Sequence, residues 1–343
     1  MTRTLFLLCL AAALFSAACE SAPVRRHTHE RLHSTLYLQR SAEYPALCRQ
    51  VYRAAAEKLD AALKDPQWSA LEGQTGTPAA LPPAVVIDLD ETVFDNSPYY
   101  AQVVRKDADF DLKQWNRWVV RAEAQLLPGA AEFIAAAQKA GVAVYFITNR
   151  DARLEGFTRL NLERRGIALD PKVDTLLMLG ETPDWKHDKS SRRSFVALTH
   201  RILLLIGDDL NDFAAIGGLD EQQRKAVVAR TAAYWGDRWF ILPNPGYGNW
   251  TDDIVKNILD DQAQLDRKYD ALRPAPDVSS EEMTELMKVP VPLFPIQLYI
   301  EAFSLPAKPQ PPATPPPEEQ TPPEENKTPA GAEPSPEPAP PAE

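Results

Sequence analysis

Cysteines and long apolar runs are scarce in this chain of 343 residues, and its 37 Lys and Arg are outnumbered by 48 Asp and Glu; each deficit excludes a class of protein. The formal net charge is -11, and no basic run is long enough to track a phosphate backbone, which argues against a nucleic-acid polymer as partner. The apolar run at residues 5–18 is too short to span a bilayer. The 3 cysteines are too few for a framework of several disulfides.

The amino terminus has the pattern of an export signal. A short cationic start and the apolar run predict a signal peptide over residues 1–18, and small residues precede Cys19. Two cleavage routes remain open. Cleavage before Cys19 with a lipid on its thiol gives a bacterial lipoprotein, and ordinary secretory cleavage gives a released protein. Either route places the protein at the bacterial outer membrane or in the periplasm, and we favour the lipid anchor.

The other two cysteines have separate predicted fates. Cys9 leaves with the signal peptide, and Cys48 then stands without a partner on a predicted helix, where it is expected to be buried. Residues 19–33 are predicted to form a solvated tether. His27, His29 and His33 cluster in this segment, and we interpret them as part of the tether rather than as a metal site.

Helical and strand-like patterns alternate along the middle of the chain. A long helix is predicted over residues 34–64, with a break or a kinked first turn at Pro45. Strand-length apolar runs follow at residues 84–88, 142–148, 175–179, 202–207 and 239–242. Helical patterns separate them at residues 129–140, 154–165, 190–199 and 209–217. This alternation predicts a parallel sheet with helices on both faces.

Two parts of the chain depart from that alternation. Residues 96–127 are rich in Tyr and Trp and include a predicted helix at 112–124, so we expect a small, mostly helical cap inserted after the first strand. The core resumes at residue 128 and runs to 287, with a helical pattern over its last part, residues 250–287, and a connecting segment covers 288–305. Residues 306–343 carry seven Glu and many Pro without apolar periodicity, which predicts a disordered and dispensable tail.

Polar residues gather where three of the predicted strands end and before one predicted helix. The clusters are Asp88-Leu89-Asp90-Glu91-Thr92, Thr148-Asn149-Arg150, Asp188-Lys189-Ser190-Ser191-Arg192-Arg193 and Gly207-Asp208-Asp209-Leu210-Asn211-Asp212. Parallel strands end at the same edge of a sheet, where open α/β sheets place their ligand crevice, so the clusters should converge. If the first strand continues, Asp88 and Asp90 share one of its faces.

The residue types in these clusters suit phosphoryl transfer. Several carboxylates in one crevice repel each other unless a cation lies among them, and all-oxygen donors favour a hard cation such as Mg²⁺. A hydroxyl, an amide and a Lys nearby are hydrogen-bond donors for a tetrahedral anion. A metal, an anion cradle and a free carboxylate together predict a phosphoryl-transfer site.

The four motifs in this order resemble those of the haloacid dehalogenase (HAD) superfamily of phosphatases. Longer stretches resemble the class C nonspecific acid phosphatases, which are bacterial surface lipoproteins. These stretches are Asp88–Tyr99, Phe146–Arg150, Asp188–Arg193, Gly207–Phe213 and Leu242–Trp250. The resemblance covers residues 34–250. It implies a HAD-like doubly wound parallel sheet with residues 34–95 and 128–287 in its core.

The resemblance also implies catalytic roles. Asp88 is the expected nucleophile, which forms an aspartyl-phosphate. Asp90 is expected to protonate the leaving alkoxide and then to deprotonate the attacking water. The Asp88 carboxylate, the Asp90 carbonyl and Asp208 are the expected Mg²⁺ ligands, with Asp212 orienting metal-bound water. Lys189 is expected to neutralise developing charge.

Substrate contacts are implied for further residues. Thr148 and Asn149, together with Lys189, are expected to cradle the phosphoryl oxygens. Tyr99 and Tyr247 are candidates for stacking on a substrate ring, which would favour nucleoside monophosphates or aryl phosphates.

Some neighbouring residues keep two interpretations. Asp209 precedes a predicted helix, so an amino-terminal cap and a metal role both fit. Lys186 competes with Lys189, which the motif favours. Arg150 is interpreted as a structural ion-pair residue rather than a substrate contact, and Asn96 is open between a turn and a site role.

We therefore expect a Mg²⁺-dependent phosphomonoesterase that hydrolyses small phosphate esters, with 5′-nucleotides and aryl phosphates as candidates. One alternative keeps the fold and transfers the phosphoryl group to an acceptor other than water. A second alternative is a surface binding or storage protein without activity, but an inactive relative typically loses its nucleophile or its phosphate-binding Lys, and Asp88 and Lys189 are both present. The oligomeric state stays open between monomer and homodimer.

Overall fold

A computed structural model describes the chain over residues 29–74, 80–170, 172–256, 258–275 and 279–288. The chain divides into two compact units, residues 1–273 and 274–343, and the second includes helix α12 (Ser280–Lys288). Several predictions concern residues outside the described ranges: the signal peptide (1–18), Cys19, most of the tether (19–33) and of the connecting segment (288–305), and the tail (306–343).

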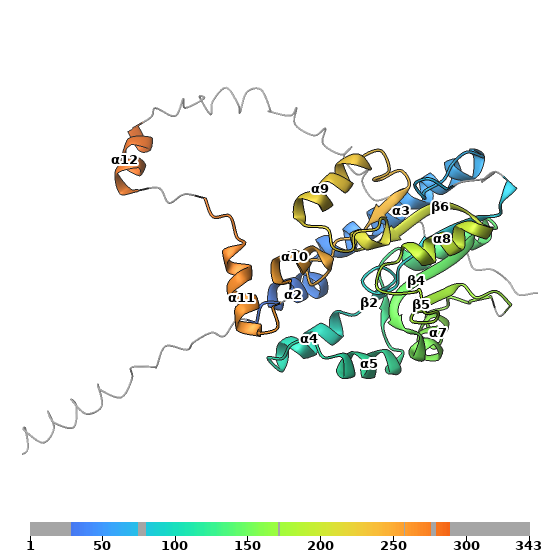
Figure 1. Cartoon of the computed structure of the whole chain (residues 1–343), viewed down its shortest axis with the longest axis horizontal. Helices are drawn as coiled ribbons and strands as arrows, with labels where there is room; N and C mark the ends of the chain where they lie inside the picture. Colours follow the sequence, from blue (N-terminus) through green and yellow to red (C-terminus); the bar gives the residue numbers. More distant parts are fainter. Residues whose placement is uncertain (1–28, 75–79, 171, 257, 276–278, 289–343) are drawn as a thin grey trace, which may run out of the picture. The chain divides into compact units, whose positions relative to one another are not determined.

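The described part of the first unit is built on a five-stranded parallel sheet with the order β5-β4-β1-β6-β7 (Figure 1). Its strands are β1 (Pro83–Ile87), β4 (Ala143–Asp151), β5 (Leu176–Leu179), β6 (Arg201–Gly207) and β7 (Trp239–Ile241). The central strand β1 pairs with β4 on one side and β6 on the other, so Ile87 lies between Phe146 and Ile206. The carboxyl ends of these strands therefore meet at one edge, as the sequence predicts.

Helices cover both faces of the sheet. Alternate residues of β1 point to opposite faces. Val85 and Ile87 belong to the core cluster that contains residues of α3 (Glu43–Lys64), α6 (Ala130–Lys139) and α7 (Glu155–Arg164). Ala84 and Val86 belong to a second cluster with residues of α8 (Ser190–Thr199) and α9 (Glu221–Arg230). The predicted doubly wound α/β fold is confirmed.

The long helix predicted at residues 34–64 is two helices, α2 (Leu32–Arg40) and α3. Ser41 separates them: its hydroxyl donates to Tyr37 O at 2.7 Å and accepts from Tyr44 N at 3.1 Å. Pro45 lies in the first turn of α3, where a missing N–H leaves no helical bond unmade. Cys48 is fully buried on α3, as predicted, and burial raises the pKa of its thiol to about 11.

The predicted cap insert contains two helices, α4 (Ser97–Arg105) and α5 (Leu112–Arg121). Its base is an antiparallel pair of short strands, β2 (Phe94–Asp95) and β3 (Gln125–Leu126). In Figure 1, α4 and α5 lie together along the lower edge of the view; α4 packs against α2, and α5 packs against α7. The helix predicted at 112–124 ends earlier, because Ala122 adopts a left-handed φ of 50°.

The prediction of a helix at residues 209–217 is wrong. The structure has a single 3₁₀ turn, η3 (Leu210–Asp212), because Asp209 and Asp212 cap each other's backbone amides in so short a span. The helix comes later as α9, which the sequence analysis missed. The chain then continues through η4 (Asn249–Thr251), α10 (Asp252–Val255) and α11 (Asp261–Asp270). Among the described residues no helix has both the length and the apolar character needed to cross a membrane.

Candidate active site

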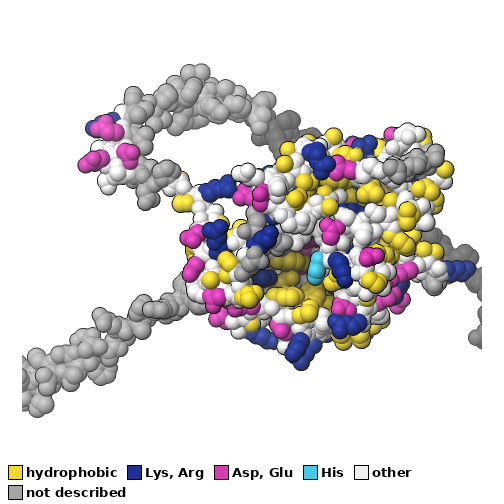
Figure 2. All heavy atoms as spheres, in the orientation of Figure 1, with side chains coloured by type: hydrophobic (Ala, Val, Ile, Leu, Met, Phe, Trp, Pro, Cys, Tyr) yellow, Lys and Arg dark blue, Asp and Glu magenta, His cyan; other side chains and the backbone are white. Residues whose placement is uncertain are grey.

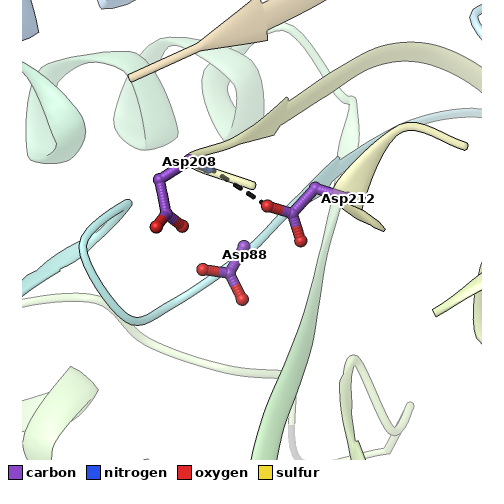
Figure 3. A group of neighbouring side chains, drawn as sticks. All are labelled: Asp88, Asp208 and Asp212. Atoms are coloured by element: carbon purple, nitrogen blue, oxygen red, sulfur yellow. Dashed lines mark hydrogen bonds between the residues drawn. The ribbon is translucent and has the colours of Figure 1, made fainter. Parts of the chain in front are cut away.

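Three carboxylates meet at the carboxyl edge of the sheet. Oxygen atoms of Asp88, Asp208 and Asp212 all lie within 4.8 Å of one another, and Figure 3 shows the three side chains converging. Asp88 directly follows β1, Asp208 directly follows β6, and Asp212 ends η3. Asp88 and Asp212 are buried, so their carboxylates have little contact with solvent. The sequence predicted this grouping from the motifs at the strand ends.

A tight turn, rather than a continuing strand, presents Asp88 and Asp90. β1 ends at Ile87, and the carbonyl of Leu89 accepts from the backbone N–H groups of Val93 at 2.8 Å and Phe94 at 2.7 Å. Glu91 adopts a left-handed φ of 58° within this turn. The idea that Asp88 and Asp90 share a strand face is therefore replaced by a turn that carries both residues to the same edge.

Asp212 shapes the loop that carries Asp208. Its Oδ2 accepts from the backbone N–H groups of Asp208 at 3.1 Å and Asp209 at 3.0 Å. The approach is so close that a Cβ on Gly207 would lie 2.2 Å from Asp212 Oδ2. A side chain at position 207 would therefore displace Asp212, so glycine is needed there.

Lys189 lies between two of the carboxylates. Its buried Nζ donates to Asp88 and, at 2.5 Å, to Asp212 Oδ1. Lys189 is the residue just before α8, and its backbone N–H donates to Asn211 Oδ1 at 3.3 Å. The alternative, Lys186, is exposed. The structure thus places Lys189 beside the expected nucleophile, as the motif favoured.

The buried charges at this site are not balanced. Burial raises the pKa of Asp88 to about 7 against the opposing effect of Lys189, and burial together with Asp88 raises the pKa of Asp208 well above its ordinary value. Burial alone would lower the pKa of Lys189, but Asp212 and Asp88 outweigh it and raise that pKa, so the ammonium stays protonated. Carboxylates outnumber the ammonium, and their donors are all oxygen. A hard divalent cation such as Mg²⁺ fits this donor set.

Residues from two other loops hold the Asp208 carboxylate. Thr92 Oγ1 donates to Oδ1 at 3.0 Å, and Asn244 Nδ2 donates to Oδ2 at 2.8 Å. Such hydrogen bonds fix the direction in which a carboxylate presents its remaining lone pairs to a metal. Asn244 lies in the stretch that resembles the last family motif, but the sequence analysis assigned it no role.

The Asp90 carboxylate faces basic and amide donors. Arg150 Nη2 donates to Asp90 Oδ1 at 2.7 Å, and Asn96 Nδ2 donates to the same oxygen at 2.9 Å. The interpretation of Arg150 as an ion-pair residue agrees with this contact, and its partner is a predicted catalytic residue. Asn96, which the sequence left open, is part of the site.

The end of β4 is clamped by Arg192, which is fully buried. Its guanidinium donates to Thr148 O and to Asn149 Oδ1, each at 2.6 Å, while Asn149 Nδ2 donates to His187 O at 3.0 Å. Burial lowers the pKa of Arg192 to about 10, still well above neutrality. Asn149 lines the cavity next to the carboxylates, whereas Thr148 is buried and does not line it.

A cavity of about 470 Å³ opens from the carboxylates toward a group of aromatic rings. Tyr100 and Tyr247 line it with ring centroids 5.2 Å apart, and Phe110 and Trp115 also line it. Tyr99, the predicted stacking residue, packs against Tyr100 and is not among the lining residues. Hydrophobic side chains also gather in the middle of the face that Figure 2 shows, with charged groups around them.

Two further acidic residues hold parts of the cavity wall in place through hydrogen bonds. Glu91 accepts hydrogen bonds from the Tyr247 hydroxyl and from Asn96 N, and burial together with Asp90 raises its pKa to about 8. Asp209 caps η3 through Asn211 N at 2.9 Å and accepts from Asn249 N at 2.7 Å. Asp209 therefore acts as the amino-terminal cap, one of its two predicted roles, and also holds the loop that follows Tyr247. The role of Glu91 had no sequence signal beyond its place in the first motif.

The chain is similar to known proteins in both sequence and structure. Residues 12–250 match the family described as HAD superfamily, subfamily IIIB (Acid phosphatase). The structure is similar to that of the class C acid phosphatase from Bacillus anthracis, with a TM-score of 0.63 and 32% sequence identity over 73% of this chain and 99% of that one. A second structure of that enzyme, with tungstate bound, gives a TM-score of 0.64 and 33% identity over the same shares of the two chains.

Proposed function

The chain belongs to the acid phosphatases of HAD subfamily IIIB, and from this premise we propose a Mg²⁺-dependent phosphomonoesterase that works through an aspartyl-phosphate on Asp88. It is a phosphoric monoester hydrolase, and its substrates are small phosphate esters. The observation that carries the proposal is the buried contact between Asp88 and Lys189, with Asp208 and Asp212 beside it.

The proposed reaction has two halves. In the first, an Asp88 oxygen attacks phosphorus, the ester P–O bond breaks, and Asp90 gives its proton to the leaving oxygen. In the second, Asp90 takes a proton from water as that water attacks the phosphorus of the aspartyl-phosphate, which frees Asp88 and inorganic phosphate. Lys189 stays charged throughout, so it offsets the negative charge that develops on the phosphoryl oxygens.

Mg²⁺ is the proposed cation because Asp88, Asp208 and Asp212 supply carboxylate oxygens alone. When bound there, it would neutralise carboxylate charge and polarise the phosphoryl group. The Asp90 carbonyl is the further ligand that the family resemblance implies. The tungstate bound by the Bacillus anthracis relative supports an anion site, since tungstate is an oxyanion like phosphate.

The substrate class follows from the outer part of the cavity. Tyr100, Tyr247, Phe110 and Trp115 offer ring faces and edges within one cavity of about 470 Å³. We propose that these rings contact an aromatic leaving group, so aryl phosphates and 5′-nucleotides are the favoured substrates. Tyr100 replaces Tyr99 among the stacking candidates because Tyr100 lines the cavity.

We also propose that the protein is exported and held at the membrane by a lipid on Cys19. The apolar run at residues 5–18 and the small residues before Cys19 support this. Membrane fractionation of Cys19→Ala after expression in a bacterium tests it. The variant should leave the membrane fraction, and retention there would contradict the anchor.

Hydrolysis of p-nitrophenyl phosphate by residues 20–343 tests the proposed reaction. Activity should require Mg²⁺ and vanish with excess chelator, and Asp88→Asn should lower kcat by at least about 1,000-fold because it removes the attacking group. Asp237→Asn is the matched control: its carboxylate pairs with Lys58 at 2.6 Å, away from the cavity, and its kcat should stay within about twofold of wild type. Full activity of Asp88→Asn would overturn the proposal.

A further inference from the structure

The carboxylate of Asp90 is held by residues that belong to, or rest on, the cap insert. Its Oδ1 accepts from Arg150 Nη2 at 2.7 Å, Arg150 Nε at 3.0 Å and Asn96 Nδ2 at 2.9 Å. Its Oδ2 accepts only a longer bond, from Arg150 Nε at 3.2 Å, among the hydrogen bonds of the described residues. The two oxygens are therefore unequal, and Oδ2 keeps the lone pairs that can carry a proton.

The orientation of Asn96 is set by α5. Asn96 is fully buried, and its Oδ1 accepts from Trp118 Nε1 at 2.8 Å. An indole N–H only donates, so this bond fixes the amide oxygen toward Trp118 and the amide nitrogen toward Asp90. The backbone N–H of Asn96 is also taken, by Glu91 Oε1 at 3.0 Å. Asn96 cannot turn without breaking a buried hydrogen bond, which is costly.

Arg150 is fixed from the same side. Its side chain is 1% exposed, and its guanidinium lies 4.8 Å from the ring centroid of Phe94 in β2 and 5.9 Å from that of Trp115 in α5. Its Nη1 has no hydrogen-bond partner among the described residues, so ring contacts complete its surroundings. Helix α5 therefore contacts both residues that hold Asp90: Trp115 contacts Arg150, and Trp118 contacts Asn96.

We propose that Trp118 and Asn96 are positioning residues for the proton transfer by Asp90. The chain of hydrogen bonds from Trp118 through Asn96 to Asp90 Oδ1 turns Oδ2 toward the cavity, which Asp90 lines. As the Asp88–phosphorus bond forms and the ester P–O bond breaks, the proton on Oδ2 moves to the leaving oxygen. The inference rests on the proposed function, and it gives the insert a part in catalysis besides contact with the substrate.

The dependence on leaving group separates this role from a general structural one. An alkoxide is a poor leaving group and needs the proton, whereas 2,4-dinitrophenolate leaves without it. Trp118→Phe keeps a ring but removes the N–H donor. For an alkyl phosphate such as glycerol phosphate, kcat/KM should fall about 10-fold, a part of the 10²–10⁴ that general acid catalysis typically contributes. For 2,4-dinitrophenyl phosphate, kcat/KM should change by less than about twofold, because kcat/KM includes only the steps up to departure of the leaving group, before Asp90 acts on water.

Trp68→Phe is the matched control. Trp68 is 9% exposed against 8% for Trp118, and its indole N–H also donates at 2.8 Å, to the carbonyl of Leu203. This variant loses an equivalent hydrogen bond away from Asp90, so the ratio of the two kcat/KM values should stay that of wild type. If Trp118→Phe does not fold, Asn96→Ser serves instead. Serine is a favoured residue at this helix-capping position but is too short to bridge Asp90 and Trp118, so the same selective loss is expected.

The experiment distinguishes failure of the positioning role from failure of the proposed function. Failure of the wild type to hydrolyse 2,4-dinitrophenyl phosphate would reject the proposed function itself. Hydrolysis by the wild type, followed by equal losses of kcat/KM on both substrates in Trp118→Phe or Asn96→Ser, would overturn the positioning role alone. A selective loss on the alkyl ester in those variants but not in Trp68→Phe supports it.

Discussion

The two ends of the cavity are built differently. The inner end consists of charged groups fixed by buried hydrogen bonds at the ends of β1 and β6, namely Asp88, Asp208 and Asp212, with Lys189 ahead of α8. The outer end consists of rings from the insert and from the loop after β7. In the proposed function, the inner end binds the phosphoryl group that all substrates share, while the rings of the outer end contact the leaving group. Different residues are therefore expected to determine the chemical step and the preference for a leaving group. Substitutions at the two ends should change different kinetic constants.

The largest effect in this comparison is expected for the Asp208 carboxylate. Asp208→Asn removes a charged oxygen donor from the group that fits Mg²⁺, so the concentration of Mg²⁺ needed for half-maximal activity should rise by at least about 100-fold. Asn244→Ala removes only the hydrogen bond to Asp208 Oδ2 and should raise it by about 10-fold. Calorimetric titration of Mg²⁺ without substrate provides a second readout.

The test depends on which of the two variants raises the Mg²⁺ requirement more. An unchanged Mg²⁺ requirement in Asp208→Asn would contradict its assignment as a ligand. Equal effects in both variants would mean that Asn244 acts through general stability, which a thermal melt would show.

A smaller and selective effect is expected at the outer end. Phe110→Ala should raise KM for an aryl phosphate by about 5-fold, since an aromatic contact contributes about 1 kcal/mol, and should leave KM for glycerol phosphate within about twofold. Phe110 lines the cavity and packs on Trp115 at 6.2 Å between centroids. Phe157 on α7 is the control: the residue is 40% exposed against 47% for Phe110, and it does not line the cavity.

Phe157→Ala should leave both KM values unchanged. A rise in KM for glycerol phosphate in Phe110→Ala as large as for the aryl ester would break the distinction between the two ends.

The smallest effect is expected at the opposite edge of the sheet, where His200 precedes β6. Burial lowers the pKa of His200 from its ordinary 6.5. The unfolded chain therefore takes up the proton first, so the stability contribution of neutral His200 is complete above pH 6.5 and is lost as the pH falls through the lower folded-state pKa. His200→Gln removes this loss, and its melting temperature should decline less steeply than that of wild type between pH 7 and pH 5.

The change should be small because His200 is only half-buried, and kcat should match wild type at each pH. Parallel declines in the two proteins would show that His200 does not titrate differently on folding.

The sequence predicted the inner end far better than the outer one. Asp88, Asp208 and Lys189 lie in contiguous motifs at strand and helix ends, and a parallel sheet must bring such ends together. The strands were found for the same reason, since buried parallel strands are continuous apolar runs. The turn at Glu91 was not predicted, because a left-handed residue other than glycine leaves no pattern in the sequence.

The outer end depends on how separate segments pack. Tyr99 and Tyr100 are adjacent in sequence, yet only Tyr100 lines the cavity, and the choice between them is set by the rotation of α4. The link from Trp118 through Asn96 to Asp90 joins three positions with no common motif. The helix expected at 209–217 failed because mutual capping by Asp209 and Asp212 favours a single turn over the helical propensity of the segment.

Trapping of the covalent intermediate is the sharpest test of the attack by Asp88 on phosphorus. The protein is mixed with labelled p-nitrophenyl phosphate and Mg²⁺, quenched in acid during turnover, reduced with borohydride to mark acyl phosphates, and mapped by peptide mass spectrometry. We expect modification at Asp88 in the wild type and none in Asp88→Asn. Modification of a different residue, or undiminished hydrolysis by Asp88→Asn, would contradict the attack by Asp88.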